Sequence, residues 1–329
     1  MLTSTNRSHP MKRTHLLVIA LPFVIGGGGM LAAACVGDEP GVLPSIPIGD
    51  GGGDKDVAVP GVDAGDAGDA GDAGRVLSVP ETISGLALWL DGTDSDSVLR
   101  NSGTDAHVKQ WSDKSGNARH YKALEPARAP FLTPSAINGK PAISFNQSAQ
   151  QYLALQAPGL SPLRAAELFI VIATGAPGTY TPPITPWRMC GFDDWSYYPY
   201  DTTTIYDGFG STTRQMSANI DPSVLAQPHV YEAVSTINYW SGWLDGTVLR
   251  YQAKPNTVAF DSQGDVLGAG SRGAWTDAGI PLVGFYFTGV IGEVIIYDHE
   301  LAAVEMAAIR EYLSAKWNIA VKPPGDAGP

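Results

Sequence analysis

Short apolar stretches recur along residues 79–320, and each is bounded by Gly, Pro, Asn or Asp. Five of them predict β-strands, because their residues are apolar or alternate between apolar and polar. These strands are expected at residues 85–90, 142–145, 168–172, 230–234 and 290–297. Residues 168–172 are apolar without alternation, which predicts a strand buried on both faces. Asp245-Gly246 lies between two further strand-like runs and predicts a two-residue hairpin.

One amphipathic helix is predicted near residues 302–316. Acidic residues lie near its start and Lys316 near its end, the favourable sense for the helix dipole. Apolar residues recur on one face at helical spacing: Met306, Ile309, Leu313 and Trp317. Many strands and one terminal helix predict an all-β fold, a sandwich of two antiparallel sheets with a C-terminal α-helix packed against it.

The first 35 residues have the pattern of a secretory leader. Lys12 and Arg13 precede an apolar run at residues 16–25, which is too short to span a bilayer because spanning takes about twenty residues. Small residues then lead to Cys35, so we interpret residues 1–35 as a lipoprotein signal peptide with Cys35 as the lipidated residue. The alternative is ordinary cleavage after an Ala-x-Ala site. Either way, we expect secretion, and lipidation would anchor the chain to a membrane of the cell envelope.

Residues 36–78 have the composition of a disordered tether. Within residues 36–74, nine acidic residues stand against Lys55, there is no aromatic residue, and Asp-Ala-Gly repeats four times from Asp63 to Gly74. Such a segment buries too little apolar surface to offset its ordering entropy, and its spaced aspartates extend the chain. The folded domain is expected at residues 79–320, followed by a disordered tail at residues 321–329.

The net charge of the chain is −12, and most of it comes from the acidic residues of the tether rather than from the folded domain. The chain has no basic patch, and we therefore expect no nucleic-acid partner.

Five segments of the domain follow one another in an order typical of one family. They are Leu86-Ala-Leu-Trp-Leu-Asp-Gly-Thr-Asp94, Val108-Lys-Gln-Trp-Ser-Asp-Lys-Ser-Gly-Asn117, Asn138-Gly-Lys-Pro-Ala-Ile-Ser-Phe145, Gly292-Glu-Val-Ile-Ile-Tyr-Asp-His-Glu-Leu301 and Glu311-Tyr-Leu-Ser-Ala-Lys-Trp-Asn-Ile319. In this respect the chain resembles the concanavalin A-like lectin/glucanase superfamily, in particular the laminin-G-like (LamG) domains of bacterial surface proteins. The resemblance implies a jelly roll of two antiparallel sheets. It also implies binding of a glycan or a surface protein, often assisted by calcium.

The catalytic pattern of the glucanases on this fold is missing from the sequence. That pattern is Glu-x-Asp-x-x-Glu, in which alternate residues of one strand bring carboxylates to the same bond. No Glu in this chain is followed two residues later by Asp, and the histidines lack zinc-ligand spacing. We therefore expect a non-enzymatic protein; the alternatives are a divergent polysaccharide hydrolase or lyase and a purely structural envelope module.

Two groups of residues are candidates for binding. Asp91 and Asp94 follow the first strand and Asp113 lies in the next loop, so their oxygens are candidate calcium ligands. Bracing of turns by the same side chains is the favoured interpretation.

The other candidate is the aromatic segment 187–209. Aromatic rings pack on the apolar faces of sugars while carboxylates accept hydrogen bonds from hydroxyls, but most of these rings are expected to fill the core or cover a sheet edge. The residues predicted to be exposed and to bind a glycan are Trp195, Tyr197 and Tyr198, with Asp193 and Asp194.

Replacement of Cys35 by alanine tests the anchor. Because the thiol is the site of lipid attachment in this interpretation, we expect Cys35→Ala to move the protein from the membrane fraction to the soluble fraction. Unchanged fractionation would contradict the lipoprotein interpretation.

Overall fold

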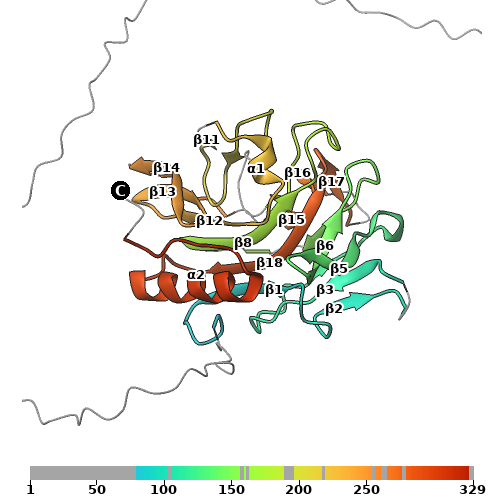
Figure 1. Cartoon of the computed structure of the whole chain (residues 1–329), viewed down its shortest axis with the longest axis horizontal. Coiled ribbons are helices and arrows are strands. Elements are labelled where there is room, and N and C mark those ends of the chain that lie inside the picture. The colour runs from blue at the N-terminus through green and yellow to red at the C-terminus, as the bar shows by residue number, and fades with distance from the viewer. Residues whose placement is uncertain are drawn as a thin grey trace, which may run out of the picture. The chain divides into compact units, whose positions relative to one another are not determined.

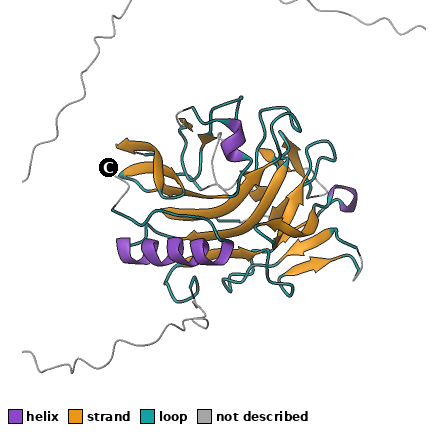
Figure 2. Ribbon diagram, viewed as in Figure 1, coloured by secondary structure: helices purple, strands orange, loops and turns teal. Residues whose placement is uncertain are grey.

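Antiparallel strands and a C-terminal helix make up the part of the chain that this computed structural model describes (Figure 1). The described residues are 79–102, 105–155, 159–160, 163–188, 196–216, 219–253, 256–260, 265–275 and 279–325. Figure 2 shows strands as the dominant element, so the predicted all-β class is confirmed.

The larger sheet contains eight strands. In spatial order, seven of them are β14 (Thr247–Ala253), β13 (Tyr239–Leu244), β12 (His229–Ser235), β8 (Ala166–Thr174), β18 (Gly289–Tyr297), β6 (Lys140–Phe145) and β5 (Phe131–Ile137). The eighth strand, β1 (Leu86–Asp91), pairs with the second half of β18, whereas β6 pairs with the first half. All five strands and the hairpin predicted from the sequence belong to this sheet.

The smaller sheet contains six short strands. They are, in spatial order, β2 (Val98–Arg100), β3 (Val108–Trp111), β4 (Tyr121–Lys122), β7 (Leu153–Leu155), β15 (Asp265–Leu267) and β9 (Trp187–Arg188). Two further pairs are β10 (Tyr206–Asp207) with β11 (Gln215–Met216), and β16 (Gly270–Trp275) with β17 (Pro281–Gly284). The short helices are η1 (Pro126–Arg128) and α1 (Pro222–Leu225).

The main core lies between the two sheets. Ile170 of β8 and Val294 of β18 share it with Trp111 of β3 and Leu267 of β15, and all four side chains are fully buried. The two faces of a strand alternate, so Phe169 points to the opposite side of the larger sheet, where it belongs to a second cluster. The central strand β8 is buried along its whole length, as its unbroken apolar sequence predicts.

The helix α2 (Ala303–Trp317) covers this second cluster. Ile309, Leu313 and Trp317 are buried against the outer face of the larger sheet, which confirms the predicted apolar stripe. Arg310 is also buried, because its guanidinium donates to both carboxylate oxygens of Glu232 at 2.8 and 2.9 Å. The helix therefore closes a third layer over the sandwich.

The hairpin between β13 and β14 turns at Asp245 and Gly246. Both residues have positive φ, 49° and 71°, which is the conformation of the two-residue type I′ turn. A Cβ at Gly246 would lie 2.3 Å from the carbonyl oxygen of Lys322, so the turn also needs glycine for close approach.

The ordered contacts continue past the predicted domain end at residue 320. The backbone N–H of Lys322 donates to the carbonyl of Asp245 at 3.0 Å, and Val321 packs on the cluster under α2. The start of the predicted tail is therefore part of the domain. Residues 1–78, with the leader, Cys35 and the tether, lie outside the described residues. Among the described helices, none has the length and apolar character needed to cross a bilayer.

The substitution Glu167→Gln tests the electrostatics beneath α2. Burial, and then the charge of Glu232, raise the pKa of Glu167 well above its ordinary value, so the folded state holds a proton that the unfolded state releases above about pH 4.3. The contribution of Glu167 to stability is thus present at low pH and is lost as pH rises. We expect the melting temperature of Glu167→Gln to exceed that of the wild type by more at pH 8 than at pH 4.5.

A suitable control is Glu311→Gln, which changes an exposed glutamate of α2. This variant should follow the wild type across the pH range. A difference between Glu167→Gln and the wild type that stays constant with pH would contradict the assignment.

Candidate functional site

The predicted calcium ligands Asp91 and Asp94 are bridged by a lysine. The Nζ atom of Lys114 lies 3.1 Å from Asp91 and 2.8 Å from Asp94, and Lys316 Nζ lies 2.8 Å from the other oxygen of Asp91. Burial raises the pKa of Asp91, but its contacts with Lys316 and Lys114 outweigh burial and lower the pKa overall. Two ammonium groups therefore stand where a bound cation was expected.

The third predicted ligand, Asp113, is hydrogen-bonded to backbone N–H groups. Its carboxylate accepts from the N–H groups of Trp89, Ser115 and Arg119 at 2.9–3.0 Å. The same loop reaches the free edge of β1, where the side chain of Asn117 donates to two β1 carbonyls. These contacts agree with bracing of the loop, and the described residues contain no group of three acidic, histidine or cysteine side chains placed to hold a metal ion. Calcium binding stays a prediction.

The predicted glycan-binding residues divide into two sets. Trp195, Asp193 and Asp194 lie outside the described residues. Tyr197 and Tyr198 are described, and their side chains are 5% and 0% exposed, so their predicted exposure is wrong.

Packing in the core explains the burial of these two tyrosines. Tyr198 lies in the core between the sheets, edge to face with Tyr231 at 5.9 Å between ring centres. Tyr197 packs against Tyr200 and Phe285 in the same edge-on manner. Apolar burial thus outweighs the polar hydroxyl at both positions.

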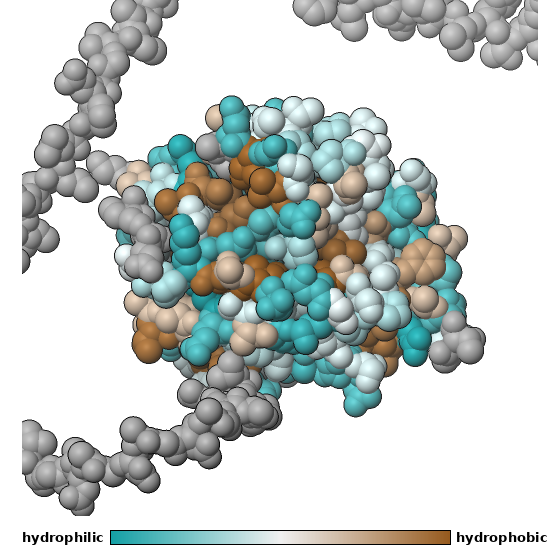
Figure 3. Space-filling model, viewed as in Figure 1, coloured by the Kyte–Doolittle hydropathy of each residue, from teal (hydrophilic) through white to brown (hydrophobic). Residues whose placement is uncertain are grey.

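The aromatic segment continues across the inner face of the larger sheet. Two hydrogen bonds attach it there. The indole N–H of Trp240 donates to the carbonyl of Phe209 at 3.0 Å, and the hydroxyl of Ser235 donates to the carbonyl of Gly210 at 2.7 Å. The segment then leads through β10 and β11 to α1. Figure 3 shows hydrophobic side chains gathered around α1, and Val224 of that helix is 41% exposed.

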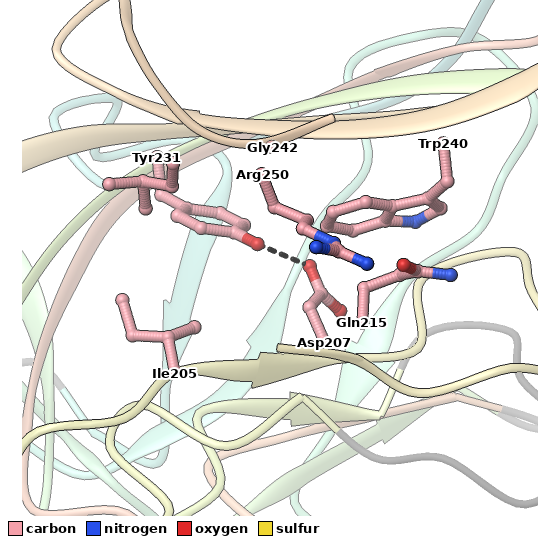
Figure 4. Close-up of a pocket in the computed structure, with 8 residues that line it drawn as sticks. Ile205, Asp207, Gln215, Tyr231, Trp240, Gly242 and Arg250 are labelled. Atoms are coloured by element: carbon pink, nitrogen blue, oxygen red, sulfur yellow. Dashed lines mark hydrogen bonds between the residues drawn. The ribbon is translucent and has the colours of Figure 1, made fainter. Parts of the chain in front are cut away.

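A small pocket lies between this segment and strands β12–β14, and we call it the Asp207 pocket. Its lining residues are Ile205, Asp207, Gln215, Tyr231, Trp240, Gly242, Leu249 and Arg250. Figure 4 shows the guanidinium of Arg250, the carboxyl of Asp207 and the amide of Gln215 pointing into one space beside the ring of Trp240. The free volume is about 10 Å³, which is room for about one water molecule or one hydroxyl group.

The carboxyl group of Asp207 is the chemical centre of the pocket. It is buried and accepts hydrogen bonds from the hydroxyls of Ser196 and Tyr231 and from the backbone N–H of Phe209. The contact with Tyr231 measures 2.6 Å and that with Phe209 2.9 Å. Burial raises the pKa of Asp207, and the hydrogen bonds from Ser196 and Tyr231 offset only part of this rise.

Gly242 keeps the pocket open. A Cβ at this position would lie 2.9 Å from the ring of Trp240 and 3.3 Å from the hydroxyl of Tyr231. The closer of these distances is shorter than normal side-chain contacts, so a larger residue would displace the groups that line the site. A glycine inside a strand between Trp240 and Trp243 is the sequence signal that could have pointed to this close approach.

Comparisons with known proteins identify no family for this chain. No protein-family model matches it, and no curated protein sequence matches it.

Among solved structures, the Trypanosoma rangeli sialidase in complex with sialic acid has 12% identity and a TM-score of 0.45, covering 71% of this chain and 33% of the sialidase. Domain 4 of AbnA, a GH43 extracellular arabinanase from Geobacillus stearothermophilus in complex with arabinotriose, has 14% identity and a TM-score of 0.40, covering 67% of this chain and 95% of that domain. The match thus spans about a third of the sialidase. At these identities and TM-scores, neither similarity assigns a ligand or an activity to this chain.

Removal of one hydroxyl tests the hydrogen bonding at Asp207. Tyr231→Phe deletes a donor to a buried carboxyl, and such bonds contribute about 1.5–3 kcal/mol when the acceptor is charged. We expect the free energy of unfolding, measured in urea, to fall by about this amount. Tyr251→Phe is the matched control, because Tyr251 is 51% exposed and should lose its hydroxyl with little effect. Equal stability of both variants would exclude a structural contact between Tyr231 and Asp207.

Proposed function

We propose that this chain is a secreted, lipid-anchored protein of the cell envelope whose concanavalin A-like sandwich binds a glycan at the Asp207 pocket. The observation that carries the proposal is the chemistry of the pocket lining. A carboxyl, an amide and a guanidinium converge on a space beside an indole ring. Convergent polar groups of this kind, set against an aromatic surface, suit a ligand that carries hydroxyl groups and apolar ring faces.

The size of the pocket defines how such a ligand would bind. The free volume takes one hydroxyl group rather than a whole sugar ring. The remainder of the glycan would then lie outside, along the exposed residues of the edge strand β14, where Arg250 and Gln252 are joined by a hydrogen bond of 2.7 Å. This arrangement favours recognition of a protruding group on a longer chain.

Binding without cleavage is the favoured form of the proposal. Cleavage of a glycosidic bond usually requires two carboxyl groups on opposite sides of that bond. Asp207 is the one carboxyl group among the described residues that line the pocket.

The raised pKa of Asp207 favours the second candidate function, a divergent hydrolase in which this group would be the general acid.

A glycan array probed with the secreted chain tests the proposal. We expect Gln215→Ala and Arg250→Ala to weaken binding of the best glycan by about tenfold, the loss of one hydrogen bond each. Gln215 is buried and Arg250 exposed, so the two variants probe the interior and the mouth of the pocket. Arg100→Ala is the matched control, because Arg100 is an exposed arginine on β2 of the smaller sheet.

The same array run with calcium and with a chelator tests the predicted metal requirement. Release of reducing sugar from pooled polysaccharides would support the hydrolase instead. A blank array, together with no cleavage, would contradict both functions and favour a structural module of the envelope.

A further inference from the structure

His229 joins two segments that are separate in the chain. Its Nδ1 atom lies 2.6 Å from a carboxylate oxygen of Asp245, in the turn of the β13–β14 hairpin. Its Nε2 atom lies 2.7 Å from the carbonyl oxygen of Val224, in α1. The histidine is the first residue of β12, and its side chain is 11% exposed.

Both neighbours of the ring are acceptors. A carbonyl oxygen can only accept, and the Asp245 carboxylate already accepts the backbone N–H of Val230 through its other oxygen at 2.8 Å. Both ring nitrogens of His229 must therefore carry a proton for both contacts to be hydrogen bonds. A neutral ring has one N–H, so a lone pair would face either the carbonyl of Val224 or the carboxylate of Asp245.

The two segments joined by His229 form the two walls of the Asp207 pocket. One wall is the segment that carries Asp207 and Gln215 and continues directly into α1. The other wall is the β13–β14 hairpin, which carries Trp240, Gly242 and Arg250 and turns at Asp245. A change at His229 therefore acts on the ends of both walls.

The charged surroundings of His229 favour the doubly protonated ring. Burial lowers the pKa of His229, but the hydrogen bond and the charge of Asp245, with the carbonyl of Val224, outweigh burial and raise it. Two other titratable residues of the described chain lie near the turn. They are Tyr198, whose buried hydroxyl is affected by the charge of Asp245, and Lys322, whose backbone N–H donates to the carbonyl of Asp245. The helix α1 contributes no titratable side chain.

We propose that His229, as an imidazolium, holds the two walls of the Asp207 pocket in register, so that glycan binding weakens when the ring loses a proton. This inference rests on the proposed function. His229 is a positioning residue, since it does not line the pocket itself. A histidine whose charged form is stabilised by folding loses that contribution as pH rises through its folded pKa, so the transition is expected above about pH 6.5.

The test is the affinity of the full secreted chain for its strongest array glycan, measured from pH 5.5 to 9. The wild type should bind about tenfold more weakly at the upper end, the effect of losing one hydrogen bond. His229→Gln should show no such transition, whereas Asp245→Asn should move it to lower pH. His299→Gln is the matched control: His299 contacts Asp298 at 2.8 Å on the surface, far along the chain from the pocket residues, and should behave as the wild type.

The comparison with His229→Gln also separates this effect from titration of Asp207, which both proteins share. Affinity of the wild type that is independent of pH, or a pH dependence in His229→Gln as large as that of the wild type, would overturn the inference.

A measurement without ligand separates failure of the inference from failure of the proposed function. Amide hydrogen exchange at Ala226, the residue that follows α1, and at Asp245 in the turn should accelerate above the transition, after correction for intrinsic pH dependence. The N–H of Ala226 donates to the carbonyl of Pro222 in α1, and the N–H of Asp245 donates to the carbonyl of Val230, next to His229. The acceleration should be absent in His229→Gln. If no glycan binds at any pH, the proposed function fails; unaltered exchange in the wild type would then also reject the role of His229.

Discussion

Beneath α2, the carboxylate of Glu293 accepts three hydrogen bonds and forms one ion pair, and it thereby joins β1, β18 and α2. The indole of Trp89 on β1 and the hydroxyl of Tyr312 donate to one oxygen, each at 2.7 Å. The indole of Trp317 and the ammonium of Lys316 lie against the other, at 2.7 and 2.8 Å. A buried charge costs several kcal/mol unless it is paired and hydrogen-bonded in this way. A shift of α2 along the larger sheet would break these contacts, so they fix the position of the helix on the sheet.

Glu293 and its partners give a structural role to most of the sequence segments on which the family resemblance rests. Segments at residues 86–94, 292–301 and 311–319 contribute these residues, and the segment at residues 108–117 supplies Lys114, which bridges Asp91 and Asp94 beside them. Gly292 belongs to the same set, because a Cβ there would lie 2.7 Å from the ring of Trp317. These residues therefore build the contact between helix and sheet. The Asp207 pocket lies on the other face of the larger sheet, at strands β12–β14, and is built from residues outside those segments.

The sequence is informative where a single local pattern decides the structure. The unbroken apolar run at residues 168–172 predicts the central strand β8, Asp245-Gly246 predicts the hairpin turn, and the spacing of Ile309, Leu313 and Trp317 predicts the buried face of α2. The smaller sheet has strands of two to four residues, which are too short to show a period. Tyr197 and Tyr198 could not be placed from composition, because aromatic residues near aspartates occur both in cores and at exposed surfaces. The pocket escapes prediction for a further reason: it combines residues from 205 to 250 that only the folded sheet brings together.

Entry of a glycan at the Asp207 pocket is tested most directly by nuclear magnetic resonance. The strongest array glycan is titrated into the labelled chain while the side-chain N–H signals of tryptophan and arginine are followed. Ligand in the pocket should shift the indole of Trp240 and the guanidinium of Arg250, which line it, and leave the indoles of Trp89 and Trp317 unchanged beneath α2. Shifts centred on Trp89 and Trp317, with Trp240 and Arg250 unaffected, would contradict binding at this site.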